Sequence, residues 1–221
     1  MNSKILFTLC LLVLLSLTIQ KADISDESSA NVSSEEATKN NDTPKYQELV
    51  STKYTYKGEI VNGKKQGKGK ITHINGANYD GDWYDDLQHG FGVLTTPDGN
   101  VLEGNWVRSK MEGKGKMYFS NGNVYDGNYS NGQAHGFGTM STKKGDKYEG
   151  QWQHGKREGQ GLYSTYDGSY YKGNFAKNTM HGFGKFIYSN KQIYEGDWVN
   201  GKREGKGTLV REDKSKYTGD F

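Results

Sequence analysis

A 23-residue repeat runs from Tyr56 to Phe221 without an insertion or a deletion. Position 1 of each unit is a tyrosine except in the third: Tyr56, Tyr79, Leu102, Tyr125, Tyr148, Tyr171, Tyr194 and Tyr217. A glycine follows two residues later, and a large apolar residue two residues after that. A fixed period of this length is typical of solenoids and arrays, so the fold must be one small unit used many times.

Each unit has the pattern of a β-hairpin. Positions 1, 3 and 5 are aromatic, glycine and aromatic, and residues two apart share one face of a strand. Positions 12, 14 and 16 are glycine, glycine and an apolar residue, which predicts a second strand. The residues between the strands, such as VNGKRE at 199–204, are typical of a turn. A strand glycine leaves a gap in which a neighbouring Tyr or Trp ring can lie over the backbone, so a single sheet needs no second layer.

The stretch YEGDWVNGKREGKG at 194–207, repeated with variations, resembles the MORN repeat (membrane occupation and recognition nexus). The resemblance covers about three quarters of the chain, as seven units and a terminal half-unit. It implies an all-β fold, an elongated, twisted, open antiparallel sheet of tandem hairpins with an aromatic-lined groove. The departures from the pattern are few: Ile60 and Leu102 for aromatic residues, and Asp86, Ser109 and Asn178 for the turn glycine.

Seven hairpins and one strand predict about 15 strands and, at ~4.8 Å per strand, a sheet on the order of 70 Å long. Both ends of such a sheet are free edges, which natural proteins usually cover or charge. The last predicted strand ends on Phe221. Because some members of the resembled family are dimers, we expect this C-terminal edge to pair, with a second copy as one candidate.

A second period of 46 residues lies on top of the first, because HGFG recurs at 89–92, 135–138 and 181–184. It places a histidine and a phenylalanine on the outer face of every even unit, where odd units carry mostly charged residues: His89, Phe91, His135, Phe137, His181 and Phe183. Equivalent residues lie four strands apart, about 19 Å. One interpretation is duplication of a two-hairpin ancestor, in which the charged pairs prevent a continuous apolar patch. The other is a ruler, three Phe knobs spaced to engage a partner.

Residues 1–22 are predicted to be a signal peptide. Lys4 precedes an uncharged apolar run from Ile5 to Ile19, which suits an h-region and is short for a membrane span. Cleavage is expected after Ala22, which is a small residue as the −1 position requires. Gln20, at the −3 position, departs from the small residue expected at that position. The expected location is therefore the secretory lumen or outside the cell. The alternative is an uncleaved segment that anchors the chain to the membrane.

Residues 23–53 are polar and acidic and are predicted to be a disordered linker, with the repeats occupying 54–221. The linker contains two N-glycosylation sequons, at Asn31 and Asn41. The only cysteine, Cys10, lies in the signal segment, so the mature chain would offer no thiol for a disulfide, a metal or a nucleophile.

No pattern of catalytic residues is found. The three histidines of the HGFG copies are too far apart to share a metal, and His73 and His154 lack neighbouring ligands at zinc spacing. DGDWYDD at 80–86 resembles a calcium loop only loosely, because it lacks a glycine and a bidentate glutamate at the required positions. GKKQGKGK at 63–70 has the wrong spacing for a phosphate-binding loop. We therefore expect no enzyme activity, metal or cofactor.

Binding is the function that remains. We expect a protein-interaction scaffold whose contacts are groove aromatics, the four tryptophans being solvent-exposed or else purely structural: Tyr79, Trp83, Trp106, Tyr125, Tyr148, Trp152, Tyr171, Tyr194 and Trp198. The alternative is a membrane-surface adaptor that binds anionic phospholipid such as a phosphoinositide through basic turns: Lys64, Lys65, Lys68, Lys70, Lys202, Arg203 and Lys206. Nucleic acid is not expected, because no basic stripe is sustained.

Overall fold

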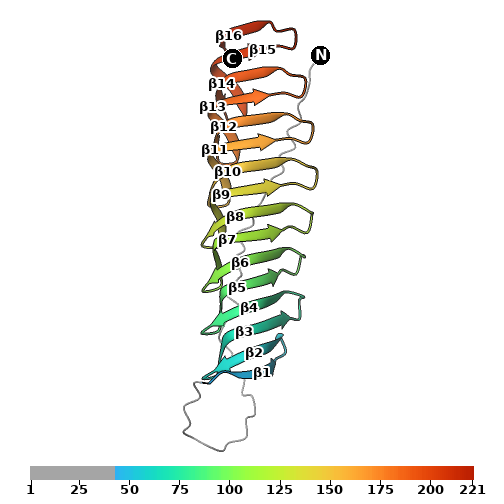
Figure 1. The fold of residues 1–221 in the computed structure, drawn as a ribbon, viewed down its shortest axis with the longest axis vertical. Coiled ribbons are helices and arrows are strands. Elements are labelled where there is room, and N and C mark those ends of the chain that lie inside the picture. The colour runs from blue at the N-terminus through green and yellow to red at the C-terminus, as the bar shows by residue number, and fades with distance from the viewer. Residues whose placement is uncertain (1–42) are drawn as a thin grey trace, which may run out of the picture. The chain divides into compact units, whose positions relative to one another are not determined.

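The computed structural model describes residues 43–221, and the predicted signal peptide, both sequons and most of the predicted linker lie outside them. The described residues form one open antiparallel sheet of 16 strands, each paired with its neighbours in sequence (Figure 1). The strands are β1 (Lys45–Val50), β2 (Tyr54–Val61), β3 (Lys64–His73), β4 (Asn78–Tyr84), β5 (Leu87–Thr95), β6 (Val101–Val107), β7 (Lys110–Tyr118), β8 (Val124–Ser130), β9 (Gln133–Ser141), β10 (Lys147–Gln153), β11 (Lys156–Ser164), β12 (Tyr170–Ala176), β13 (Thr179–Ile187), β14 (Ile193–Val199), β15 (Lys202–Val210) and β16 (Lys216–Asp220). The predicted all-β sheet of tandem hairpins is confirmed. Within residues 43–221 no helix is long and apolar enough to cross a membrane.

Strand β1 corrects the predicted linker, because residues 45–50 are ordered against β2. Leu49 lies opposite Tyr56, and Gln47 lies opposite Gly58. The turn that follows is closed by Ser51, whose Oγ accepts the backbone N–H of Tyr54 at 3.0 Å. The polar composition of the surrounding segment concealed this strand, so the described sheet has 16 strands instead of about 15.

Each hairpin contains a bulge next to its central glycine pair. Gly81 lies opposite Gly92, after which the register shifts and Asp82 lies opposite His89. Gly90 in the bulge has a φ of 57°, and the glycine at position 12 of the other complete units is likewise positive. The freed N–H of Phe91 donates to Asp82 Oδ2 at 3.0 Å. The position-12 glycine is therefore required by backbone conformation, and the prediction that it leaves a gap for a ring is wrong.

The glycines at positions 3 and 14 do make room for a ring, as predicted. The Tyr79 ring lies over Gly81 and Gly92, and a Cβ added to Gly92 would lie 2.2 Å from Tyr79 Oη. The hydroxyl donates to the Asp82 carbonyl at 3.0 Å. The same arrangement recurs in every unit except the third, and we call this row of position-1 tyrosines the tyrosine ladder.

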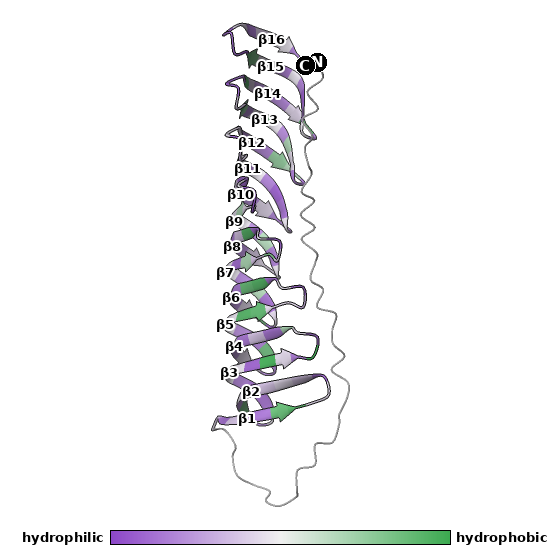
Figure 2. Ribbon diagram, turned by 90° about the vertical axis from the view of Figure 1, so that its right-hand side faces the viewer, coloured by the Kyte–Doolittle hydropathy of each residue, from purple (hydrophilic) through white to green (hydrophobic). Residues whose placement is uncertain are grey.

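Residues at position 5 connect successive tyrosines of the ladder. Trp83 meets Tyr79 of its own unit and Tyr56 of the preceding unit edge-to-face, with ring centroids 5.3 and 5.5 Å apart. Its indole N–H donates to the Gly69 carbonyl at 2.8 Å. Figure 2 shows much of the sheet in purple or pale shades, because the ladder is built from glycine and amphipathic aromatics rather than aliphatic residues. This explains how a chain with a mean hydropathy of -0.92 has an ordered core.

The ladder is interrupted in unit 3, where Leu102 replaces tyrosine. The side chain of Met111 fills the space, and its terminal methyl would lie 2.3 Å from a Cβ added to Gly115. The next position 5 holds Tyr129, whose buried hydroxyl has no hydrogen-bond partner within the described residues. The contacts that join units 3 and 4 therefore differ from those of the other junctions.

Hydrogen bonds also join successive units at both ends of the hairpins. At the turns, the backbone N–H of Gly155 donates to the Ala134 carbonyl of the preceding unit at 2.9 Å. At the loops, the side chain of Asn100 accepts the backbone N–H of Ser120 at 2.9 Å. Equivalent bonds recur along the sheet, so each unit is stabilised by its neighbours in sequence.

Candidate functional site

The nine groove aromatics predicted as contacts are buried. The exposed fraction is 6% for Trp83, 3% for Trp106 and Trp152 and 4% for Trp198, and the five tyrosines are at most 1% exposed. The prediction that the tryptophans are solvent-exposed is therefore wrong. Their contacts are those of a core, which agrees with the structural role weighed as the alternative.

Side chains at position 10 cover the ladder. Lys65 Nζ lies 5.6 Å from the Tyr56 ring centroid and 5.7 Å from that of Trp83, and its side chain is only 14% exposed. Arg157 lies 5.5 Å from the Tyr148 ring. Met111, Ala134 and Met180 occupy the same position in other units and are buried. Burial raises the pKa of Tyr56 and of Tyr148 to about 12.

The basic residues predicted to face lipid are mostly engaged within the sheet. Lys64 pairs with Asp85, which raises the pKa of the lysine through a hydrogen bond, and Lys70 approaches Asp80 at 3.6 Å. Further pairs join Lys68 to Asp82 and Lys206 to Asp220. Lys65 pairs with Asp86 at 3.4 Å and also lies over the Tyr56 ring, and Arg203 lies 5.3 Å from the Tyr194 ring centroid. Lys202 is exposed. Local carboxylates thus neutralise most of the positive charge that the sequence indicated.

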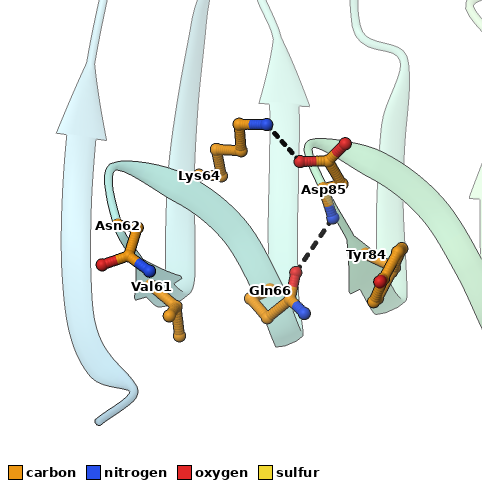
Figure 3. Close-up of a pocket in the computed structure, with 6 residues that line it drawn as sticks. All are labelled: Val61, Asn62, Lys64, Gln66, Tyr84 and Asp85. Atoms are coloured by element: carbon orange, nitrogen blue, oxygen red, sulfur yellow. Dashed lines mark hydrogen bonds and ion pairs between the residues drawn. The ribbon is translucent and has the colours of Figure 1, made fainter. Parts of the chain in front are cut away.

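A shallow hollow at the turns of the first two hairpins shows this pairing (Figure 3). Its volume is about 350 Å³, and it is lined by Val61, Asn62, Lys64, Gln66, Tyr84 and Asp85. Lys64 meets the Asp85 carboxylate, and Gln66 Oε1 accepts the Asp85 N–H at 2.9 Å. Within residues 43–221 no three His, Cys, Asp or Glu side chains gather closely enough to hold a metal. The contacts in this hollow join the turn of the first hairpin to the turn of the second.

The three Phe knobs lie on the outer face, as the sequence predicted. Phe91 on β5 lies opposite Asn105, and Phe137 on β9 lies opposite Gln151. Both alternate with glycines of the aromatic face, so their rings point away from the ladder. Phe91, Phe137 and Phe183 are 50%, 65% and 57% exposed.

The histidines of the HGFG copies do not form a uniform set with the phenylalanines. His89 is half-buried, with its ring 5.6 Å from Tyr84 and its Nδ1 buried without a partner in the described chain. His135 lies 5.7 Å from His154, whereas His181 is exposed. In odd units, position 11 holds a side chain whose oxygen accepts a hydrogen bond from a backbone N–H of the next turn, at 2.8–2.9 Å. These residues are Gln66, Glu112 and Glu158. The 46-residue alternation therefore decides which units have this side-chain hydrogen bond to the next turn at position 11.

Tyr46 on β1 extends the row of Phe knobs, and its place in the row was not predicted from the sequence. It lies opposite Glu59 in the register that places Phe91 opposite Asn105, and it is 74% exposed. Tyr46 precedes Phe91 by one residue less than the 46-residue period, so only the pairing of β1 reveals the match. We call Tyr46, Phe91, Phe137 and Phe183 the aromatic row. Its members occur on every fourth strand, about 19 Å apart.

Polar residues separate the members of the aromatic row at the same position of the intervening odd units: Lys68, Lys114, Gln160 and Lys206. All four are exposed. Beside Phe91 and Lys114 the outer face has a second shallow hollow of about 310 Å³, bordered by Tyr118 and by the Lys116–Asp126 pair at 3.0 Å. The outer face therefore alternates aromatic and polar groups about 10 Å apart, and three of the four polar groups are lysines.

The chain end after β16 places Phe221 against the ladder. The Phe221 ring is half-buried, 4.8 Å from Tyr194 and 5.3 Å from Tyr217, and its N–H donates to the Gly205 carbonyl at 2.9 Å. Phe221 thus continues the ladder. Pairing of this edge with a second copy stays a prediction.

Comparison with known proteins identifies the repeat. The MORN repeat family model matches seven consecutive segments: 56–77, 79–101, 103–124, 125–147, 148–170, 171–193 and 194–216. The chain matches no curated protein.

Three solved structures resemble the sheet at low identity. The SAS-4 (dCPAP) TCP domain of Drosophila melanogaster, in complex with a proline-rich motif of Ana2 (dSTIL), is 11% identical, with a TM-score of 0.44 over 80% of this chain and 90% of that one. The TCP10 domain of Danio rerio CPAP is 12% identical, with a TM-score of 0.40 over 78% and 88%. The CPAP G-box domain is 12% identical, with a TM-score of 0.41 over 79% and 97%.

Proposed function

The chain belongs to the MORN-repeat family, whose members are repeat scaffolds, and we propose that it is a non-enzymatic scaffold that binds a protein partner. The contact surface is the aromatic row on the outer face, because the ladder aromatics of the opposite face are covered. The observation that carries the proposal is the exposure of all four rings of the row, from 50% to 74%.

Exposed aromatic rings are the residues that most often anchor protein interfaces. In the aromatic row, rings occur on every fourth strand at the same place along the strand. Charged or amide side chains separate them and keep the free face soluble. A partner that covers several rings would bury apolar area at regular intervals along the sheet. This supports the interpretation of the 46-residue period as a ruler.

Binding of an anionic membrane is the alternative function. The pairing of Lys64, Lys68, Lys70 and Lys206 with carboxylates argues against it, because paired cations present little net charge to a lipid surface. Vesicle binding that requires anionic lipid and falls steeply with salt would favour this alternative over the protein scaffold.

We place the scaffold in the secretory lumen or outside the cell, after cleavage behind Ala22. N-terminal sequencing of the expressed protein tests this, together with protease protection in intact microsomes. A start at Asp23 with protected repeats is the expected result. An intact Met1 with protease-sensitive repeats would instead support a membrane anchor.

The central experiment is quantitative capture of partners from the secretory fraction of expressing cells. The bait proteins are the wild type, the triple variant Phe91→Ser, Phe137→Ser, Phe183→Ser, and the control Tyr166→Ser. Tyr166 lies in a loop and is 62% exposed, close to the 65% of Phe137. We expect a specific partner to be lost with the triple variant and kept with the control. A partner kept by all three baits would contradict the proposal.

A further inference from the structure

The aromatic members of the row on one sheet can face the polar members of the same row on a second copy whose strand order is reversed. Its aromatic members lie on β1, β5, β9 and β13, and the polar members at the same position lie on β3, β7, β11 and β15. The two sets are offset by two strands, about 10 Å. A two-fold axis parallel to the strands relates two copies whose outer faces meet and whose strand orders run in opposite directions. The position of the row along the strands is the same in both copies.

One position of that axis matches the whole row. If it passes through β8, then β9 of one copy lies over β7 of the other, β13 over β3, β5 over β11, and β1 over β15. The contacts across the interface are then Phe137 with Lys114, Phe183 with Lys68, Phe91 with Gln160, and Tyr46 with Lys206. Each occurs twice by symmetry.

The chemistry of these contacts is favourable. Lys114, which forms no ion pair within residues 43–221, brings an ammonium to the Phe137 ring of the other copy, which is a cation–π arrangement. Lys68 and Lys206 lie opposite Phe183 and Tyr46 as members of ion pairs with Asp82 and Asp220. The intervening ion pairs, such as Lys116–Asp126, leave the face without a block of like charge. A sheet face of 16 strands offers on the order of 1,500 Å² per copy, and a stable interface needs about 800 Å² per partner.

We propose that the partner of the aromatic row is a second copy of this chain, packed face to face and antiparallel about a two-fold axis at β8. This inference rests on the proposed function in using the same surface, and it names the occupant. It differs from the C-terminal edge pairing expected from the sequence, because the contact is between outer faces along the full sheet.

Light scattering on the purified full chain tests the mass in solution over a range of concentrations. We expect a dimer for the wild type and for Tyr166→Ser, and a monomer for the triple variant Phe91→Ser, Phe137→Ser, Phe183→Ser. Lys114→Glu removes two contacts at once and should raise the dissociation constant roughly 5- to 30-fold. A wild type that stays monomeric overturns the inference, as does a dimer that survives the triple substitution.

Cross-linking locates the axis. In a Cys10→Ser background, Asn128→Cys on β8 places its thiol near its own symmetry mate, whereas Gln151→Cys on β10 lies four strands from its mate. Both residues occupy position 4 of their units and are half-buried. A short bis-maleimide should link Asn128→Cys and leave Gln151→Cys unlinked. The reverse pattern, or linkage through a Thr218→Cys variant on β16 alone, would overturn the inference in favour of another dimer.

The two proposals fail separately. A monomeric chain whose captured partner is lost with the triple variant keeps the scaffold and removes the homodimer. A dimer that the triple variant dissociates, with no other captured protein, leaves the second copy as the partner.

Discussion

Substitution of the position-14 glycine by alanine should be harmful under a tyrosine and mild where the tyrosine is absent. At Gly92 the new Cβ would lie 2.2 Å from Tyr79 Oη and 2.4 Å from Cζ. The ring cannot move easily, because Trp83 and Trp106 hold it edge-to-face at 5.3 and 5.5 Å. At Gly115, in unit 3, the new Cβ would clash only with the end of the flexible Met111 side chain, and it would lie 3.1 Å from the Glu103 carbonyl oxygen and 3.3 Å from Tyr129 Cδ2.

The expected magnitudes follow from these contacts. Overpacking a rigid site costs about 1–3 kcal/mol, and displacing the Tyr79 hydroxyl from the Asp82 carbonyl costs about 1 kcal/mol more. The lower backbone entropy of alanine offsets about 0.5–1 kcal/mol. Gly92→Ala should therefore lower the free energy of unfolding by about 1–3.5 kcal/mol. Gly115→Ala should change it by less than about 1 kcal/mol, because methionine adapts.

Urea unfolding, followed by tryptophan fluorescence and by circular dichroism, measures both variants against the wild type. Agreement of the two probes is needed before a single free energy is assigned to a repeat protein. The Tyr79→Leu background, which imitates Leu102, should reduce the effect of Gly92→Ala by about 1–2 kcal/mol. Equal losses for Gly92→Ala and Gly115→Ala would refute the reasoning.

Three further predictions concern the ladder and its cover. Burial raises the pKa of six ladder tyrosines, so the folded state favours the neutral phenol and the stability is complete below pH 10. Between pH 10 and about 12 the free energy of unfolding should fall by up to about 1.4 kcal/mol per pH unit for each of Tyr56 and Tyr148, whose pKa burial raises to about 12, and a profile that stays flat in urea titrations would contradict this. Trp83→Phe should cost about 1 kcal/mol in urea unfolding, because the hydrogen bond to Gly69 is lost while the ring contacts stay; no change would mean that the bond contributes nothing. Lys65→Met should leave the melting temperature within about 3 °C, because Met111 and Met180 fill the same position elsewhere, and a large drop would show that the charge is needed.

The fold followed from the sequence because local pattern and packing coincide in this repeat. The spacing of Tyr56, Gly58 and Gly69 indicates a strand pair over which a ring can lie, and the period indicates how often that pair recurs. The bulge at Gly67 did not follow, because a glycine required for a positive φ and a glycine required for space are identical letters.

The candidate site was predicted in part. The outward direction of Phe91 followed from alternation along the strand, but the burial of Trp83 did not, because it depends on position-10 side chains that cover the aromatic face. The neutralisation of Lys68 by Asp82 required cross-strand register, since the two residues are far apart in the sequence. Tyr46 could not be placed without the pairing of β1, whose spacing departs from the period by one residue.

If the aromatic row binds the partner and the ladder does not, the two sets of rings should differ in hydroxyl-radical footprinting with mass spectrometry, on the chain alone at low concentration and in its complex. Phe91, Phe137 and Phe183 should be oxidised in the free chain and protected in the complex, while Trp83 and Trp152 should be unreactive in both. Protection confined to the tryptophans, with the phenylalanines unchanged, would contradict it and return the binding surface to the aromatic face.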